Sequence, residues 1–149
     1  MNRPHPTFDD KGTFDWHTEI GKALSEAQTD GKRLLIEYGR EQCSQCRALV
    51  QAVLPRPEIA ELVASSFVLL AADCDDAEED VEELALKLED AMQLPFVLII
   101  DEHGQFLEGF SGVIEPERLR RTLERLAPAQ AAAGSSNLED SSTGSPEPS

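Results

Sequence analysis

The sequence contains two cysteines separated by two residues, Cys43-Ser44-Gln45-Cys46, and this pair is the feature best suited to chemistry. One turn of helix brings side chains three residues apart onto the same face, so the two sulfur atoms would lie side by side. At the start of a helix, free backbone N–H groups and the positive end of the dipole stabilise a thiolate at Cys43. Cys43 would then attack a partner's disulfide, and Cys46 would release the partner by attacking the mixed disulfide. The motif therefore indicates thiol–disulfide exchange.

The same spacing also occurs as one half of a zinc site, which needs a second pair of ligands. The remaining candidates are Cys74, His5, His17 and His103, and none of them has paired ligand spacing. Thiol chemistry is therefore favoured over metal binding. Cys74 leaves an odd number of cysteines and is expected to be a small buried core residue, with a regulatory thiol near Cys43 as the alternative.

The elements around the pair follow from hydrophobic spacing. The short apolar run Leu34–Tyr38 predicts a strand that is covered on both faces and ends at Gly39. Apolar residues at helical spacing begin at Cys46, so Cys43 would lie between the strand and the first helical turn. Glu37 stands inside the apolar strand, where a carboxyl group taken out of water can act as acid or base near neutrality. Alternation alone leaves open a wet position for Glu37 at the sheet edge.

Helical and strand patterns alternate along the rest of the chain. We expect helices near residues 15–30, at 46–54 with a continuation through 59–63, at 73–90 and from 116 onward. Strands are expected at 34–38, 67–72, 94–100 and 106–110, the last two as a hairpin. The segment 73–90 has ten acidic residues, which predicts a helix with a heavily charged outer face. The order α-β-α-β-α-β-β-α predicts an α/β domain.

Composition limits the domain and its partners. The 149 residues suffice for one core, which we place at 11–127, between a flexible lead-in at 1–10 and a disordered tail at 128–149. With 13 Lys and Arg against 29 Asp and Glu, the net charge of -16 disfavours binding to nucleic acid or anionic membranes. No apolar run is long enough to span a membrane, and the first residues do not resemble a signal peptide. We therefore expect a cytoplasmic protein.

Several features in the same order resemble the thioredoxin superfamily, and most closely its divergent bacterial members. They run from about Phe14 to Leu126 and comprise Trp16, the strand Leu34–Tyr38, the cysteine motif, Asp73-Cys74-Asp75 at a strand end, Leu94-Pro95-Phe96, Gly104 and Gly112. The resemblance implies a three-layer α/β/α sandwich with a central mixed sheet. It also implies a cis Pro95 that faces the cysteine pair, and a Leu94 whose backbone pairs with an extended substrate segment. Gln42 and Gly112 complete the substrate-binding side that it implies.

The resemblance puts Glu37 in the place of a buried Asp that moves the proton of the second cysteine. The family's usual Lys neighbour would fall near Ala71 and is missing. Gln42 replaces the common Trp before the first cysteine, Ser44-Gln45 replaces Gly-Pro, and Gln51 stands where a helix-kinking proline is usual. These departures predict a thioredoxin-like protein with its own reduction potential and specificity.

Together these features predict a thiol–disulfide oxidoreductase that acts on protein disulfides. Cys43 would be the attacking thiolate, Cys46 the resolving thiol and Glu37 the proton acceptor. The reaction needs no metal or organic cofactor, and an external reductant would recycle the oxidised protein, which we expect to act as a monomer in cell redox homeostasis. The alternative is a non-catalytic thioredoxin-like module for protein interaction or redox sensing. The missing Trp before Cys43 favours this alternative, and the retention of both cysteines disfavours it.

Overall fold

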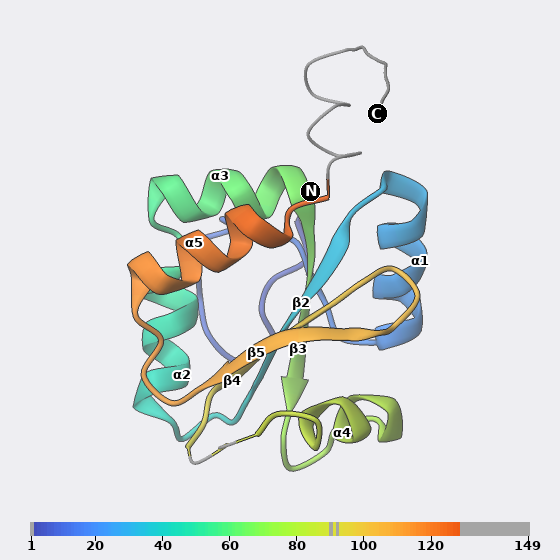
Figure 1. Ribbon diagram of the computed structural model, residues 1–149. Coiled ribbons are helices and arrows are strands. Elements are labelled where there is room, and N and C mark those ends of the chain that lie inside the picture. The colour runs from blue at the N-terminus through green and yellow to red at the C-terminus, as the bar shows by residue number, and fades with distance from the viewer. Residues whose placement is uncertain (1, 90, 92, 129–149) are drawn as a thin grey trace.

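The computed structural model describes residues 2–89, 91 and 93–128 of the chain (Figure 1). Apart from Pro128, the tail expected at 128–149 lies outside these residues. The elements in chain order are β1 (Trp16–His17), α1 (Ile20–Asp30), β2 (Arg33–Gly39), α2 (Ser44–Ala48), the π-helical turn η1 (Leu49–Val53), α3 (Pro57–Ser66), β3 (Phe67–Asp73), α4 (Glu79–Ala85), β4 (Phe96–Ile100), β5 (Phe106–Ser111) and α5 (Pro116–Leu126). In the part of the chain described here, no helix has the length and apolar content needed to cross a membrane.

The strands form one mixed sheet in the order β1-β3-β2-β4-β5. β1 and β2 both run parallel to β3, while β4 runs antiparallel to β2 and to β5. β2 therefore lies at the centre of the sheet with neighbours on both sides. Its apolar sequence fits this place, because a strand covered on both faces has no exposed side. The predicted mixed sheet is confirmed.

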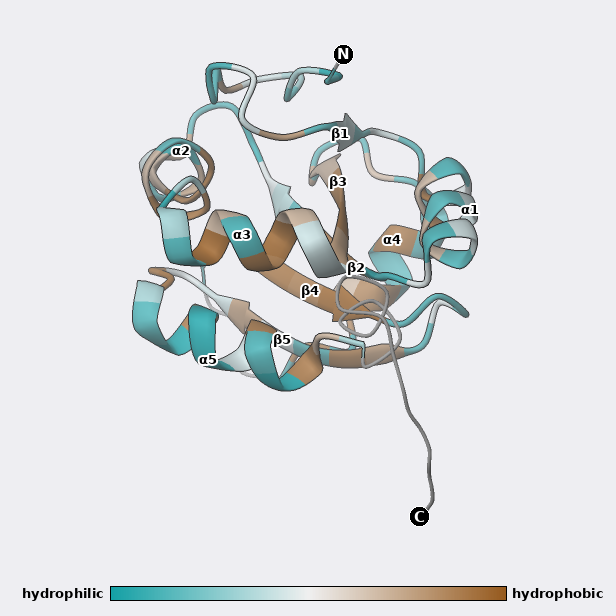
Figure 2. Cartoon of the chain, turned by 90° about the horizontal axis from the view of Figure 1, so that it is seen from above, coloured by the Kyte–Doolittle hydropathy of each residue, from teal (hydrophilic) through white to brown (hydrophobic). Residues whose placement is uncertain are grey.

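Helices cover both faces of the sheet, which confirms the expected three-layer α/β/α arrangement. The core on one face joins Leu34 and Ile36 of β2 to apolar residues of α1 and α4. The core on the other face joins Leu35 to apolar residues of α2, η1, α3 and α5. Figure 2 shows apolar residues concentrated in the strands and on the sheet-facing sides of the helices. Because strand residues alternate between faces, Glu37 points to the same side as Leu35, toward α2.

Two predicted helices are shorter in the structure. The helix expected at 15–30 begins only at Ile20, because Trp16 pairs with Leu69 of β3 as part of the short strand β1. The acidic helix expected at 73–90 is confined to Glu79–Ala85. Its first residues form a turn instead, in which the backbone N–H of Asp75 donates to the Asp73 side chain at 2.9 Å. Such side-chain bonds to a neighbouring backbone compete with the helix.

Within residues 2–10, for which the sequence predicts a flexible lead-in, three side chains are packed into the domain. Phe8 is 4% exposed and belongs to the core that contains α2 and α3. His5 and Asp10 are buried as well. The Asp10 carboxylate accepts a hydrogen bond of 2.9 Å from the indole Nε1 of Trp16. The composition of 1–10 is polar, but its few anchoring side chains find partners in the core.

Candidate functional site

The two cysteines occupy the start of α2, as the sequence predicted. Cys43 is the N-cap residue of this helix and has extended backbone angles, φ -148° and ψ 106°. Its Sγ accepts a hydrogen bond of 3.1 Å from the backbone N–H of Cys46. The strand β2 ends at Gly39, so a short loop separates the sheet from the helix. A sulfur at the N-cap receives the N–H groups and the positive dipole end that favour a thiolate.

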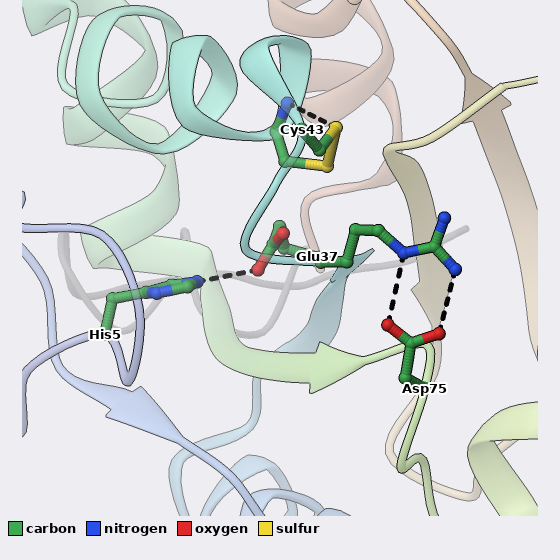
Figure 3. Close-up of a disulfide and its surroundings, with 6 residues drawn as sticks. His5, Glu37, Cys43 and Asp75 are labelled. Carbon is green, nitrogen blue, oxygen red and sulfur yellow. Dashed lines mark hydrogen bonds and ion pairs between the residues drawn. A yellow bond between two sulfur atoms is a disulfide. The ribbon is translucent and has the colours of Figure 1, made fainter.

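Cys43 and Cys46 are joined by a disulfide, with their Cα atoms 5.2 Å apart (Figure 3). The two cysteines differ sharply in exposure. Cys46 is 0% exposed and belongs to the hydrophobic core, whereas Cys43 is half-buried. Cys43 is therefore the sulfur that solvent reaches. The structure represents the oxidised state of the pair.

Glu37 lies beneath the disulfide and is 2% exposed, so the alternative of a wet position at the sheet edge is excluded (Figure 3). Gly39 separates its carboxylate from Cys46. A Cβ atom on Gly39 would lie 2.6 Å from Cys46 Sγ and 2.7 Å from Glu37 Oε2. The sulfur and the carboxylate oxygen are therefore no more than about 5.3 Å apart, the sum of those two distances. The absence of a side chain at Gly39 allows this approach.

His5 is a partner of Glu37 that could not be identified from the sequence. The sequence suggests this histidine only as a possible zinc ligand. Its Nε2 lies 2.7 Å from Glu37 Oε1, and both side chains are 3% exposed (Figure 3). The ring packs edge-on against Trp16, with ring centroids 4.7 Å apart, and stacks on Phe8. His5 and Glu37 are 32 positions apart in the sequence, and no periodicity or motif links the two. A histidine close to Phe8 and Trp16 is the one hint in the sequence that this segment packs.

A small cavity of about 20 Å³ adjoins the His5–Glu37 pair. Its walls include Gly39, Arg40 and Ala71 in addition to the pair. Ala71 of β3 stands directly opposite Glu37 in the sheet register. The space is large enough for about one water molecule. The cavity thus offers a place for a proton-carrying water next to the buried carboxylate.

Three of the predicted substrate-side residues lie beside the last two strands: Leu94 and Pro95 precede β4, and Gly112 follows β5. The Leu94–Pro95 bond is cis, as the resemblance implies. The backbone N–H of Gly112, which has a φ of 82°, donates to the Pro95 carbonyl at 3.0 Å. Gln42 is exposed next to Cys43. Val113, 70% exposed, follows Gly112 and was not singled out from the sequence.

Cys74 follows β3 and is the free cysteine of the described residues. It is only half-buried, so its prediction as a buried core residue is correct in part. Burial raises the pKa of the Cys74 thiol, and the Arg40 guanidinium acts in the opposite direction. Arg40 also donates two hydrogen bonds to Asp75, which lower the pKa of that carboxyl group.

The positions of these groups do not favour the zinc alternative. In the described part of the chain, Asp73, Cys74 and Asp75 are the side chains of metal-ligand type that converge. That cluster contains neither Cys43 nor Cys46. The four candidates for a second ligand pair are scattered, since His5 bonds to Glu37, His17 bonds to Glu26 and His103 lies in the β4–β5 turn.

A mixed sheet of this order between two helical layers, with a disulfide across the first turn of the helix after β2, defines a thioredoxin-fold protein. Residues 15–102 match the sequence pattern described as thioredoxin-like. The chain belongs to the thioredoxin-like family. His5 lies outside the matched residues, whereas Glu37, both cysteines and Pro95 lie inside them.

Solved structures support the same fold. A thioredoxin from Thermus thermophilus has a TM-score of 0.61 and 19% identity, over 80% of this chain and 91% of that one. A disulphide isomerase from Xylella fastidiosa has a TM-score of 0.53 and 20% identity, over 72% and 87% of the two chains. A poplar thioredoxin h has a TM-score of 0.54 and 22% identity, over 74% and 96%. No curated protein matches the chain in sequence.

Proposed function

We propose that the protein is a thiol–disulfide oxidoreductase that exchanges its Cys43–Cys46 pair with disulfides of client proteins. One observation carries the proposal: the sulfurs are bonded across the first turn of α2, with the leading cysteine half-buried and the following one wholly buried. This difference supports a division of roles, because a client's disulfide reaches the more accessible sulfur. The similar structures include a thioredoxin and a disulphide isomerase, which supports the same class of reaction.

The reaction begins with the reduced pair. The Cys43 thiolate attacks one sulfur of the client disulfide, which forms a mixed disulfide and releases the client's other sulfur as a thiolate. Cys46 then loses its proton to Glu37 and attacks the Cys43 sulfur. The Cys43–Cys46 bond forms, the bond between Cys43 and the client breaks, and the second client sulfur leaves as a thiolate. The client gains two electrons, and its two thiolates take up protons from the solvent. The protein loses two electrons and, once Glu37 releases it, the one proton that Cys46 held.

Two features favour Leu94 and its neighbours as the docking edge for an extended client segment. Leu94 directly precedes β4 at the cis bond to Pro95, and among the described residues its backbone makes no hydrogen bond. The exposed side chain of Val113 offers an apolar contact beside Gly112. Gln42 borders Cys43 on the other side and would meet the client as well. An external reductant would restore the dithiol after each turnover.

The test is the reduction of a model protein disulfide by the wild type and by Cys43→Ser. We expect activity in the wild type, none in Cys43→Ser, and unchanged activity in the control Cys74→Ser. Equal rates for the wild type and Cys43→Ser would end the enzyme proposal. They would leave the alternative of a non-catalytic module for protein interaction or redox sensing.

A further inference from the structure

The N-terminal segment contributes a buried imidazole to a site whose other parts lie between β2 and α2. His5 Nε2 is 2.7 Å from Glu37 Oε1, and the other carboxylate oxygen, Oε2, faces Cys46 across Gly39. The carboxylate thus lies between the histidine and the sulfur. The residues that match the thioredoxin-like pattern begin at 15, so the histidine lies outside that pattern.

The hydrogen bonds around His5 determine which ring nitrogen has the proton. Nδ1 accepts two backbone N–H groups, from Thr7 and from Phe8, each at 3.0 Å. A nitrogen that accepts hydrogen bonds has no proton of its own, so the ring proton is on Nε2. Nε2–H therefore donates to Glu37 Oε1. A second proton on the ring would have to displace both backbone donors.

The segment that holds His5 is fixed to the body of the protein at several points. Gln51 of η1 donates from Nε2 to the Asp9 carbonyl at 3.0 Å. Phe8 is buried in the core below α2, and the Arg47 guanidinium lies over its ring, 5.8 Å from the centroid. These contacts tie the segment to the helix that begins at the disulfide. The imidazole is therefore oriented by the same element that positions Cys46.

We propose that His5 is a positioning residue for the exchange reaction: its Nε2–H bond holds the Glu37 carboxylate with Oε2 turned toward Cys46. The inference rests on the proposed function, in which Glu37 takes the Cys46 proton in the resolving step. His5 itself donates one hydrogen bond and passes no proton on, because Nδ1 is occupied by Thr7 and Phe8.

Two substitutions separate the hydrogen bond to Glu37 from the folding of the segment. In His5→Asn the amide oxygen takes the place of Nδ1 and still accepts from Thr7 and Phe8, but the donor to Glu37 is lost. In His5→Gln the longer side chain brings an amide N–H to the place of Nε2 and keeps the bond to Glu37. Arg3→Ala is the control for the segment, since it removes the contacts of the Arg3 guanidinium with Asp15, Glu26 and His17 and leaves His5 and Glu37 in place.

The measurement uses the reduced full-length chain and a symmetrical aromatic disulfide that releases a coloured thiolate at each step. The first release reports attack by Cys43, and the second reports resolution by Cys46. We expect His5→Asn to slow the second release about tenfold, the effect of one hydrogen bond to a charged group. The first release should stay within about twofold of the wild type. The other charged or titratable groups near the pair are the same in all variants, namely Arg40 and Asp73 of the cavity wall and Cys46.

The outcomes distinguish this inference from the proposed function. If His5→Asn resolves at the wild-type rate, or if His5→Gln is as slow as His5→Asn, the histidine does not position Glu37. If the wild type releases no thiolate that depends on Cys43, the proposed function itself is wrong. A measurement on the wild type tests the inference even if the variants do not fold. NMR of the His5 ring nitrogens should show a proton on Nε2 and none on Nδ1 at neutral pH, and the opposite tautomer would overturn the inference.

Discussion

The Cys46 sulfur and the Glu37 carboxylate face each other across Gly39, in a part of the protein that solvent does not reach. The sulfur is the buried member of the disulfide, and the carboxylate is the buried charged group nearest to it in sequence. A thiol in such a place cannot lose its proton directly to bulk water. This relationship supports the proposal that Glu37 is the base for the resolving cysteine.

Replacement of Glu37 by Gln should slow resolution about a hundredfold and leave the attack by Cys43 nearly unchanged, because general base assistance typically contributes about that much. Gln has almost the same shape, and its amide oxygen still accepts from His5. Release of the two coloured thiolates from an aromatic disulfide measures both steps. Glu58→Gln, at an exposed carboxylate on α3, is the matched control. Equal slowing of both phases in Glu37→Gln would show that the carboxylate is not the base for Cys46.

Cys46→Ser should accumulate mixed disulfides with client proteins, because Cys43 can still attack but no thiol remains to release the client. The complexes are separated without reductant and identified by mass spectrometry. Cys43→Ser with Cys46 intact is the control, since its one remaining thiol of the pair is buried. An empty trap after oxidative challenge would favour a protein-interaction module without exchange activity.

Gly39→Ala should destabilise the oxidised protein by about 2 kcal/mol and slow resolution, because the added Cβ displaces Cys46 Sγ or Glu37 Oε2. Urea unfolding of the oxidised chain measures the stability. Gly21→Ala in α1 is the control, since a Cβ there meets nothing within 4 Å. That substitution should leave the stability unchanged or raise it by up to about 1 kcal/mol. Wild-type stability in Gly39→Ala would mean that the sulfur and the carboxylate have more room than the structure indicates.

Alkylation of Cys74 should depend on pH in a way that reveals Arg40. In the oxidised protein Cys43 and Cys46 are bonded, so Cys74 is the thiol that reacts. Burial raises its pKa above that of an ordinary cysteine, and the Arg40 guanidinium opposes this rise. The midpoint of alkylation should lie above that of the urea-unfolded chain and should move higher still in Arg40→Gln. Mass spectrometry at a series of pH values measures both midpoints.

The control for this experiment is Arg56→Gln, at an exposed arginine that pairs with Glu58 on α3. It should leave the Cys74 midpoint in place. A midpoint that falls in Arg40→Gln would contradict the electrostatic account, because loss of a cation near a thiol cannot favour its thiolate.

Local patterns in the sequence predict most of the fold and, within the site, the position of the cysteine pair. The apolar run at Leu34–Tyr38 and the Cys43–Cys46 spacing each reflect short-range geometry, and both lie where they were predicted. Trp16 was assigned to a helix because its spacing with Ile20 is helical, while its backbone pairs with a strand far along the chain. Alternation could not show whether Glu37 was buried, since that depends on which elements cover β2.

The contribution of His5 could not be predicted for the same reason. Its contact with Glu37 joins two segments 32 positions apart, and in a polar, proline-containing stretch only the nearby Phe8 and Trp16 hint that it packs. Burial of Phe8 and the hydrogen bonds to Asp10 provide the anchoring that composition does not reveal. Tertiary contacts, more than local propensity, determine the order of this segment.

The packing of Phe8 against the core has a practical consequence for anyone who trims this protein for expression. A shortened form that starts at the first residue of the family pattern would keep the sheet, both cysteines and Glu37. It would lack Phe8, so water would reach the buried side of the site. Such a form would be a poor stand-in for the intact chain in any redox assay.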